Sequence, residues 1–397
     1  MNVNIDKLYK VGAKRHRKVI GLMSGTSLDG LDIAYCTISD FGRNTKVIIE
    51  SFETIPYQED IKERIRNVFA KKEVDFPYLV QLNEWLGTLH GIMVNAFLET
   101  HGIEKTDVDV IASHGQTVMH VPKHQHTHHD FNHATLQIGD GDQLSVKTGI
   151  ITISDFRQKH IAAGGEGAPL AVYGDYLMFS EKGQNRIMLN IGGIANFTYL
   201  PADGLASSVF VTDTGPGNTL MDAWTKKYFD LPYDKEGLIA GKGKVNIDLL
   251  NRLKSNNFFK LEFPKTTGPE LFNLAFLEDI IQSFDQMNIS KEDVLTTLNR
   301  FTAETIADAI KAVISDCSFH IYLSGGGAHN HILVTTLKTF LPDCFFGISD
   351  DLGINGDAKE AVLFAVLANE TLAGEPIDFG QRQGVPSICM GKISFPS

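Results

Sequence analysis

Cysteine is scarce in this chain of 397 residues, and its four cysteines, Cys36, Cys317, Cys344 and Cys389, show no Cys-x-x-Cys spacing. This excludes a zinc ribbon and argues against a disulfide framework, so we expect a reducing, cytoplasmic setting. Long apolar runs are missing too, because no stretch approaches the roughly 18–20 residues that a membrane helix requires. The apolar run 19–23, which follows a basic segment, is too short for a secretory signal. We therefore expect no membrane partner.

Basic residues are in deficit. The 36 Lys and Arg residues are outnumbered by 48 Asp and Glu, which gives a formal charge of −12. Nucleic acids and anionic membranes need a basic footprint, so neither is expected as a partner. A small anionic ligand needs only local amides and one or two cations, and stays possible. The hydrophobic share of 43% and the charged share of 21% are those of a soluble globular protein, and the length favours two domains.

Two common nucleotide-binding motifs are absent. Nothing matches the Walker pattern G-x-x-x-x-G-K-[ST], and the triple glycine of LSGGGAHN (323–330) lacks the G-x-G-x-x-G spacing of a dinucleotide site. Neither a P-loop nor a dinucleotide-binding Rossmann unit is therefore expected.

The chain instead repeats one pattern twice, in which a strand, a turn of small residues and a second strand precede alternating helices and strands. This predicts an α/β fold with two similar lobes and a boundary near 181–184. The first hairpin should turn at Asp29-Gly30. Periodicity predicts strands at 19–23, 31–38, 47–55, 108–112, 150–154, 187–200 (a hairpin), 209–212 and 321–324, and helices at 58–70, 77–100, 218–229, 271–286, 290–315 and 358–373.

Three turns rich in glycine follow strands, in GLMSGTSLDG (21–30), NIGGIANF (190–197) and LSGGGAHN. Each alone is explained equally well as a plain hairpin or a structural loop. Exposed backbone amides in such turns also bind phosphate, and Asp29 could hold a magnesium ion beside it. Three such loops spread over two lobes are hard to explain as independent turns, so together they favour ATP bound in a cleft between the lobes.

Asp213 lies in the segment TDTGPGN (212–218), at the end of an apolar strand. Burying an unpaired carboxylate in a core costs free energy, so a purely structural role in the core would not explain it. It could form a turn or cap, and Asn218 could cap the next helix. The functional interpretation makes Asp213 a general base that acts on a hydroxyl or on water.

Other polar motifs have equally open interpretations. Arg157 in DFRQKH suits a bidentate contact with a carboxylate or phosphate, or an ion pair with Asp155 or Glu166. HGQT (114–117) has the donors and acceptors that bind sugar hydroxyls, or a buried, satisfied histidine. Glu360 could belong to the site, or to a capping box with Asp357.

Six histidines crowd the segment 120–133, namely His120, His124, His126, His128, His129 and His133. They look like metal ligands, but no acidic partners recur at a regular spacing. We expect a solvated loop.

Taken in order, GLMSGTSLDGLDIA, SHGQT, QIGD, DFR, GGEGAPL, NIGGIAN, DTGPGN and SGGGAHN resemble the motifs of the anhydro-N-acetylmuramic acid kinase family. They extend from residue 21 to about residue 365. The resemblance implies two ribonuclease-H-like lobes of the actin-like ATPase type around an ATP cleft. We expect residues 1–184, completed by 366–397, to form the first lobe and residues 185–365 to form the second.

The implied reaction converts 1,6-anhydro-N-acetylmuramic acid, ATP and water to N-acetylmuramic acid 6-phosphate and ADP, a step of peptidoglycan recycling. Asp213 matches the catalytic aspartate, and a homodimer that uses Mg²⁺ is implied. The matching ATP segment is Gly25, Thr26, Ser27, Leu28, Asp29, Gly30, Leu31 and Asp32. The turns of the second lobe would add Asn190, Gly192, Gly193, Gly325, Gly326 and Gly327, and the candidate sugar contacts are His114, Gln116, Arg157, Glu166 and Glu360.

Two features depart from the family pattern. Glu166 stands in GGEGAP where Gln is expected, and the histidine-rich stretch 120–133 is longer than the usual connection. Two other functions are compatible with the same motifs. One is a kinase of the same superfamily that phosphorylates an ordinary sugar hydroxyl, and the other is an ATP-dependent sugar sensor without turnover.

Overall fold

The computed structural model describes residues 1–127, 129–283, 289–313, 319–380 and 384–397. Cys317 and His128 lie outside these ranges, as do parts of the helices expected at 271–286 and 290–315. Within the described ranges, no helix is long and apolar enough to cross a membrane.

The chain divides into two compact units. Unit 1 comprises Met1–Phe179, Leu205–Ser208 and Gly353–Ser397, and unit 2 comprises Ser180–Gly204 and Val209–Leu352. Residues 353–365, which the sequence interpretation placed in the second lobe, group with unit 1 in this division.

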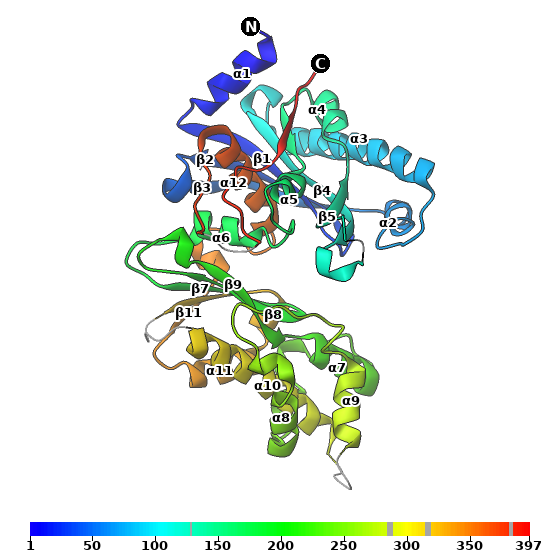
Figure 1. The fold of residues 1–397 in the computed structure, drawn as a ribbon, viewed down its shortest axis with the longest axis vertical. Coiled ribbons are helices and arrows are strands. Elements are labelled where there is room, and N and C mark those ends of the chain that lie inside the picture. Colours follow the sequence, from blue (N-terminus) through cyan, green and yellow to red (C-terminus); the bar gives the residue numbers. More distant parts are fainter. Residues whose placement is uncertain (128, 284–288, 314–318, 381–383) are drawn as a thin grey trace. The chain divides into compact units, whose positions relative to one another are not determined.

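Unit 1 is built on a mixed sheet in the order β12-β6-β4-β1-β2-β3, with β5 paired to β4 (Figure 1). Strands β1, β2 and β3 form an antiparallel meander, and β4 and β6 run parallel to β1. The strands are β1 (His16–Ser24), β2 (Gly30–Ser39), β3 (Lys46–Pro56), β4 (Val110–Val121), β5 (Ala134–Ile138), β6 (Thr152–Ser154) and β12 (Lys392–Ser394).

Helices cover both faces of this sheet. The amphipathic α3 and the short α4 pack together on one side, and α12 packs on β1, β2 and β4 (Figure 1). The core under α3 joins Leu86 and Phe97 to Ile20 and Ile33 of the sheet. The helices of unit 1 are α1 (Val3–Gly12), α2 (Glu59–Arg66), α3 (Phe76–Thr100), α4 (Gly141–Thr148), α5 (Phe156–Ala162), α6 (Ala171–Phe179) and α12 (Lys359–Ala373).

Unit 2 repeats the same strand order in a sheet of β11-β10-β7-β8-β9. Again the first three strands form an antiparallel meander, and the two later ones run parallel to the first. The strands are β7 (Arg186–Ile191), β8 (Ile194–Leu200), β9 (Phe210–Pro216), β10 (His320–Ser324) and β11 (Phe345–Ile348). The helices are α7 (Thr219–Phe229), α8 (Ile247–Lys254), α9 (Leu274–Gln282), α10 (Lys291–Val313) and α11 (His331–Phe340).

The matching topologies confirm the expected α/β class and the repeated ribonuclease-H-like pattern. The expected turn at Asp29-Gly30 is wrong. Gly30 already belongs to β2, opposite Pro56 of β3, and the connection is the five-residue loop 25–29. Glycine is required at position 30 because a Cβ there would lie 2.3 Å from the Ile55 carbonyl oxygen. In this loop it is Leu28 that takes a positive φ, of 60°.

Gly21 lets α12 approach β1 closely, and replacing it by Ala should destabilise the chain. A Cβ at this position would lie 1.9 Å from the Ala361 carbonyl oxygen, which cannot move without shifting the helix. Overpacking of this kind costs about 1–3 kcal/mol or more. Thermal unfolding should show a lower Tm for Gly21→Ala. The control Gly241→Ala, whose Cβ would meet its first neighbour at 3.5 Å, should unfold like the parent chain.

Candidate active site

The loop 25–29 connects β1 to β2 in unit 1. Thr26, Ser27 and Asp29 are exposed, whereas Leu28 is buried and its N–H donates to the Gly25 carbonyl at 3.3 Å. Burying Leu28 fixes the loop, so its two hydroxyls and one carboxylate face solvent. This arrangement suits a phosphate-bearing ligand.

Acidic side chains gather beside this loop. Partial burial raises the pKa of Asp32, the Thr54 hydroxyl that donates to it acts in the opposite sense, and the charges of Asp357 and Asp29 raise it further. A divalent cation would relieve this repulsion. The described residues contain no ready-made group of three metal-ligating side chains. Magnesium bound with a nucleotide needs only one or two carboxylates, so the donors present fit it.

Arg157, on α5, is held by His114 of β4. The Arg157 Nε donates to His114 Nε2 at 2.7 Å, and Nη1 donates to the Gly167 carbonyl at 2.7 Å. His114 Nε2 must then accept, so Nδ1 carries the ring proton and donates to the Gly115 carbonyl at 2.8 Å. Burial, helped by the Arg157 charge, lowers the pKa of His114 to about 3. His114 is therefore a neutral residue that orients the guanidinium.

Glu360 lies in the first turn of α12 and interacts with the Arg157 charge. Its side chain reaches solvent, yet crowding by protein atoms raises its pKa, while Arg157 acts in the opposite sense. The alternative of a capping box is not realised, because the N-cap is Ala358 and makes no side-chain cap bond. Nor does Arg157 pair with Asp155, whose partner is Lys392 at 2.9 Å.

The two features that depart from the family pattern, Glu166 and the histidine-rich stretch 120–133, lie next to each other in the structure. Glu166 Oε1 lies 3.8 Å from Nε2 of His133, at the end of the histidine-rich stretch. The other described histidines of this stretch are exposed or half-buried, and no three metal-ligating groups converge among the residues that the structure covers.

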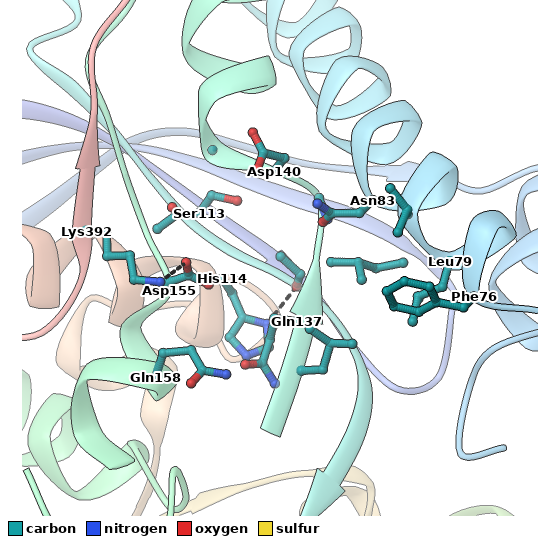
Figure 2. A pocket seen from close by; sticks show the side chains of 17 residues that line it. Phe76, Leu79, Asn83, Ser113, His114, Gln137, Asp140, Asp155, Gln158 and Lys392 are labelled. Atoms are coloured by element: carbon teal, nitrogen blue, oxygen red, sulfur yellow. Dashed lines mark hydrogen bonds and ion pairs between the residues drawn. The ribbon is translucent and has the colours of Figure 1, made fainter. Parts of the chain in front are cut away.

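A hollow of about 390 Å³ lies beside His114 (Figure 2). One wall is apolar and comes from Phe76, Leu79 and Leu136, while Ser113 and Gln137 add polar atoms. The Ser113 hydroxyl and the Gln137 Oε1 are fully buried and have no hydrogen-bond partner among the described residues. Because its lining combines apolar and polar side chains, the hollow suits a ligand that has both apolar and polar groups.

In unit 2, three sequence motifs converge at the turn between β7 and β8. The N–H groups of Gly217 and Asn218 donate to the carbonyls of Gly193 and Gly192, each at 2.8 Å. A Cβ at Gly217 would lie 2.3 Å from the Gly192 oxygen, and one at Gly325 would lie 2.6 Å from Asn190 Oδ1. Close backbone contact therefore explains why these turns are glycine-rich.

Two details of these motifs differ from expectation. Asn218 does not cap α7 with its side chain, because its Nδ2 donates to the Ile191 carbonyl at 3.1 Å. After β10 the triple glycine enters the short 3₁₀ helix Gly326–His329, and α11 starts later, capped by Asn330.

Asp213 is half-buried on β9. Its Oδ2 accepts a hydrogen bond from the Thr267 N–H at 2.8 Å, and its Oδ1 has no hydrogen bond to any described residue. Burial raises the pKa of Asp213, and the Thr267 N–H acts in the opposite sense. One oxygen is thus fixed and the other is left to accept a proton.

Asp222, in the first turn of α7, is a second candidate for the catalytic carboxylate, and the sequence interpretation did not include it. Burial raises its pKa to about 6, and its backbone N–H donates to the Asn218 carbonyl at 2.8 Å. The spacing of four residues from Asn218 was the available signal, because it puts both residues on one face of a helix.

Fold and sites together define a two-unit α/β protein with glycine-rich turns in each unit and a half-buried carboxylate on β9. A model of the family described as "Anhydro-N-acetylmuramic acid kinase" matches residues 17–395, so the chain belongs to this family.

Curated relatives carry the same name. One from Pseudoalteromonas atlantica is 54% identical over 100% of both chains. One from Caldanaerobacter subterraneus is 36% identical over 98% of this chain and 100% of its own. Among solved structures, the activator of 2-hydroxyisocaproyl-CoA dehydratase from Clostridium difficile, with bound ADPNP, is 13% identical, covers 90% of this chain and 96% of its own, and has a TM-score of 0.41.

Proposed function

We propose that this chain is an ATP-dependent kinase that opens 1,6-anhydro-N-acetylmuramic acid hydrolytically and phosphorylates O6, giving N-acetylmuramic acid 6-phosphate and ADP. The observation that carries this proposal is the 54% identity to a kinase of that name over the full length of both chains. We further propose that it acts in the cytoplasm, in peptidoglycan recycling, as a homodimer.

Asp213 is the proposed general base. Its Oδ1 takes a proton from water as the water oxygen bonds to C1 of the sugar and the C1–O6 bond breaks. The freed O6 bonds to the γ-phosphorus of ATP, and the bond from that phosphorus to the β,γ-bridging oxygen breaks to release ADP. The hydrogen bond from Thr267 to Oδ2 supports this role, because it fixes the carboxylate while leaving Oδ1 available.

The glycine-rich turns are the proposed ATP contacts. In unit 1 these are residues 25–32, and in unit 2 they are Asn190, Gly192, Gly193 and Gly325–Gly327. Their backbone amides would stabilise the phosphate charge that develops during transfer. Asp29, with Asp32 beside it, would hold the Mg²⁺ that accompanies ATP and neutralises part of that charge.

The proposed sugar site gathers on unit 1 around Arg157. His114 orients the guanidinium, and Glu360 balances its charge. Glu166 is a further proposed contact; the family motifs also imply Gln116, although its buried amide is engaged by Ser24 and by the Gly25 carbonyl. The hollow beside His114, whose lining combines an apolar wall with the polar residues Ser113 and Gln137, suits a sugar substituent that has both methyl and amide groups.

The activity can be tested by incubating the purified chain with Mg²⁺, ATP and 1,6-anhydro-N-acetylmuramic acid and analysing products by mass spectrometry. The proposal predicts ADP and a sugar heavier by one water and one phosphoryl group. Phosphorylation of an ordinary hexose in preference would instead identify a different sugar kinase. Binding of both ligands without ADP formation would identify a sensor.

A further inference from the structure

Four polar side chains form a continuous buried hydrogen-bonded chain in unit 1. His90 of α3 contacts the Tyr57 hydroxyl at 2.7 Å, and that hydroxyl lies 2.9 Å from Ser24 Oγ. Ser24 in turn is bonded to Gln116 Oε1. None of the four residues is more than 3% exposed. Each hydroxyl in such a chain has one proton to donate, so fixing the donor at one end fixes the direction of the whole chain.

The proton positions follow from the end at Gln116. Gln116 Nε2 faces two carbonyl oxygens, of Gly25 and Thr117, each at 3.1 Å, so it donates and Oε1 accepts. The Ser24 hydroxyl must therefore donate to Oε1 and accept from Tyr57, and Tyr57 must accept from His90. His90 then carries its proton on Nε2 and leaves Nδ1 bare. Nδ1 is buried and has no hydrogen-bond partner among the described residues, and burial keeps the ring neutral by lowering its pKa to about 4.

This chain holds the loop 25–29 at both of its ends. Gln116 holds the Gly25 carbonyl at the start. The backbone N–H of Tyr57 donates to the Asp29 carbonyl at 3.0 Å at the other end. Tyr57 thus contacts the exit of the loop with its main chain and, through Ser24, the entrance with its side chain.

We propose that His90 and Tyr57 are positioning residues that act through Ser24 and Gln116 to fix the loop 25–29 for nucleotide binding. On this basis Gln116 acts on the nucleotide through Gly25, rather than on the sugar by direct contact, because its amide is fully buried and engaged at both ends. The inference rests on the proposed function, in which this loop binds the phosphates of ATP. A displacement of about 1 Å in a group that positions the reactants can lower the rate about 100-fold. Hydrogen bonds that fix the loop therefore have a large effect on catalysis.

The main test is Tyr57→Phe, which removes one hydroxyl and keeps the ring. The matched control is Tyr173→Phe, because Tyr173 is also buried and its hydroxyl donates to the Pro386 carbonyl at 2.7 Å, outside the chain of four. Titration calorimetry with Mg²⁺ and the non-hydrolysable analogue AMP-PNP measures binding directly. Tyr57→Phe should weaken binding about tenfold, as expected when a buried donor and acceptor lose their partner. Tyr173→Phe should bind like the parent chain.

His90 offers a test by conservative rescue. His90→Gln keeps a donor where Nε2 lies and should retain most of the AMP-PNP affinity. His90→Leu removes the donor and should weaken binding as Tyr57→Phe does, and the two changes together should cost little more than either alone. In steady-state kinetics, the KM for ATP should rise in the weakened variants while the KM for the anhydro sugar stays within about twofold, since the chain reaches only the nucleotide loop.

Gln116→Glu separates the two roles of residue 116. A carboxylate can still accept from Ser24 but cannot donate to the Gly25 carbonyl, so AMP-PNP affinity should fall. A rise in the KM for the sugar alone would overturn the inference, as would equal AMP-PNP affinities for Tyr57→Phe and Tyr173→Phe. Because AMP-PNP binding needs no turnover, a parent chain that binds the analogue without kinase activity would contradict the proposed function and leave this test readable.

Discussion

Asp213→Asn should abolish turnover without weakening nucleotide binding. The amide cannot take a proton from water, and loss of a general base costs about 10²–10⁴-fold in rate. Single-turnover kinetics with saturating ATP and anhydro sugar measure this loss directly. Calorimetry with AMP-PNP should give the same affinity for the variant and the parent chain.

The fold should tolerate this change. Burial raises the pKa of Asp213 above the usual value of 3.8, so the folded state holds its proton more tightly than the unfolded state. At neutral pH the ionised carboxylate therefore costs stability, and the Asn variant should have an unchanged or higher Tm. By the same reasoning, activity of the parent chain should fall as the pH drops through this raised pKa.

Asp248→Asn is the matched control, because Asp248 is an exposed carboxylate on α8 of the same unit. It should keep full activity. If Asp213→Asn retained more than a tenth of the parent rate, Asp213 would not be the base, and Asp222 on α7 would become the next carboxylate to test.

Arg157→Ala should have the second-largest effect. It leaves His114 Nε2 without its donor and Glu360 without the nearby cation. Leaving a buried acceptor such as His114 Nε2 without its donor costs about 1–3 kcal/mol, or roughly 5-fold to 150-fold in kcat/KM. Steady-state kinetics in which the anhydro sugar is varied should show the loss, with the KM for ATP little changed.

Two variants serve to interpret this result. Arg157→Lys keeps the charge but not the planar fork, so it should recover only a small part of the activity. Arg15→Ala removes an arginine whose side chain is 78% exposed and should behave like the parent chain. Equal kcat/KM values for Arg157→Ala and the parent chain would exclude Arg157 from the sugar site.

The α/β class and the repeat of one pattern were predictable because they follow from a periodic signal. Two apolar runs around a turn of small residues, followed by alternating helices and strands, occur twice, and each occurrence folds into the same sheet topology. Two short strands escaped prediction because their residues form no continuous apolar run like those that indicated the equally short β6 and β10. These are β12 (Lys392–Ser394) and β5 (Ala134–Ile138).

The site residues also divide into those that the sequence indicated and those that only the structure reveals. Motif order indicated the glycine-rich turns and Asp213, because backbone approach and strand-end carboxylates leave a local signature. The chain from His90 to Gln116 leaves none, since its members are separated by dozens of residues and meet only when α3 packs on the sheet. The donor that holds Asp213, the backbone N–H of Thr267, is likewise invisible in a sequence because any residue except proline supplies it.

The central claim is that water opens the anhydro bridge and O6 receives the phosphoryl group. The most direct measurement runs the reaction in ¹⁸O-water, quenches it early and locates the label by mass spectrometry. Preformed product held for the same time in ¹⁸O-water corrects for exchange at C1. The account predicts one ¹⁸O on C1 of N-acetylmuramic acid 6-phosphate and none in its phosphate. Phosphorylated product without label at C1, or with label in its phosphate group, would contradict it.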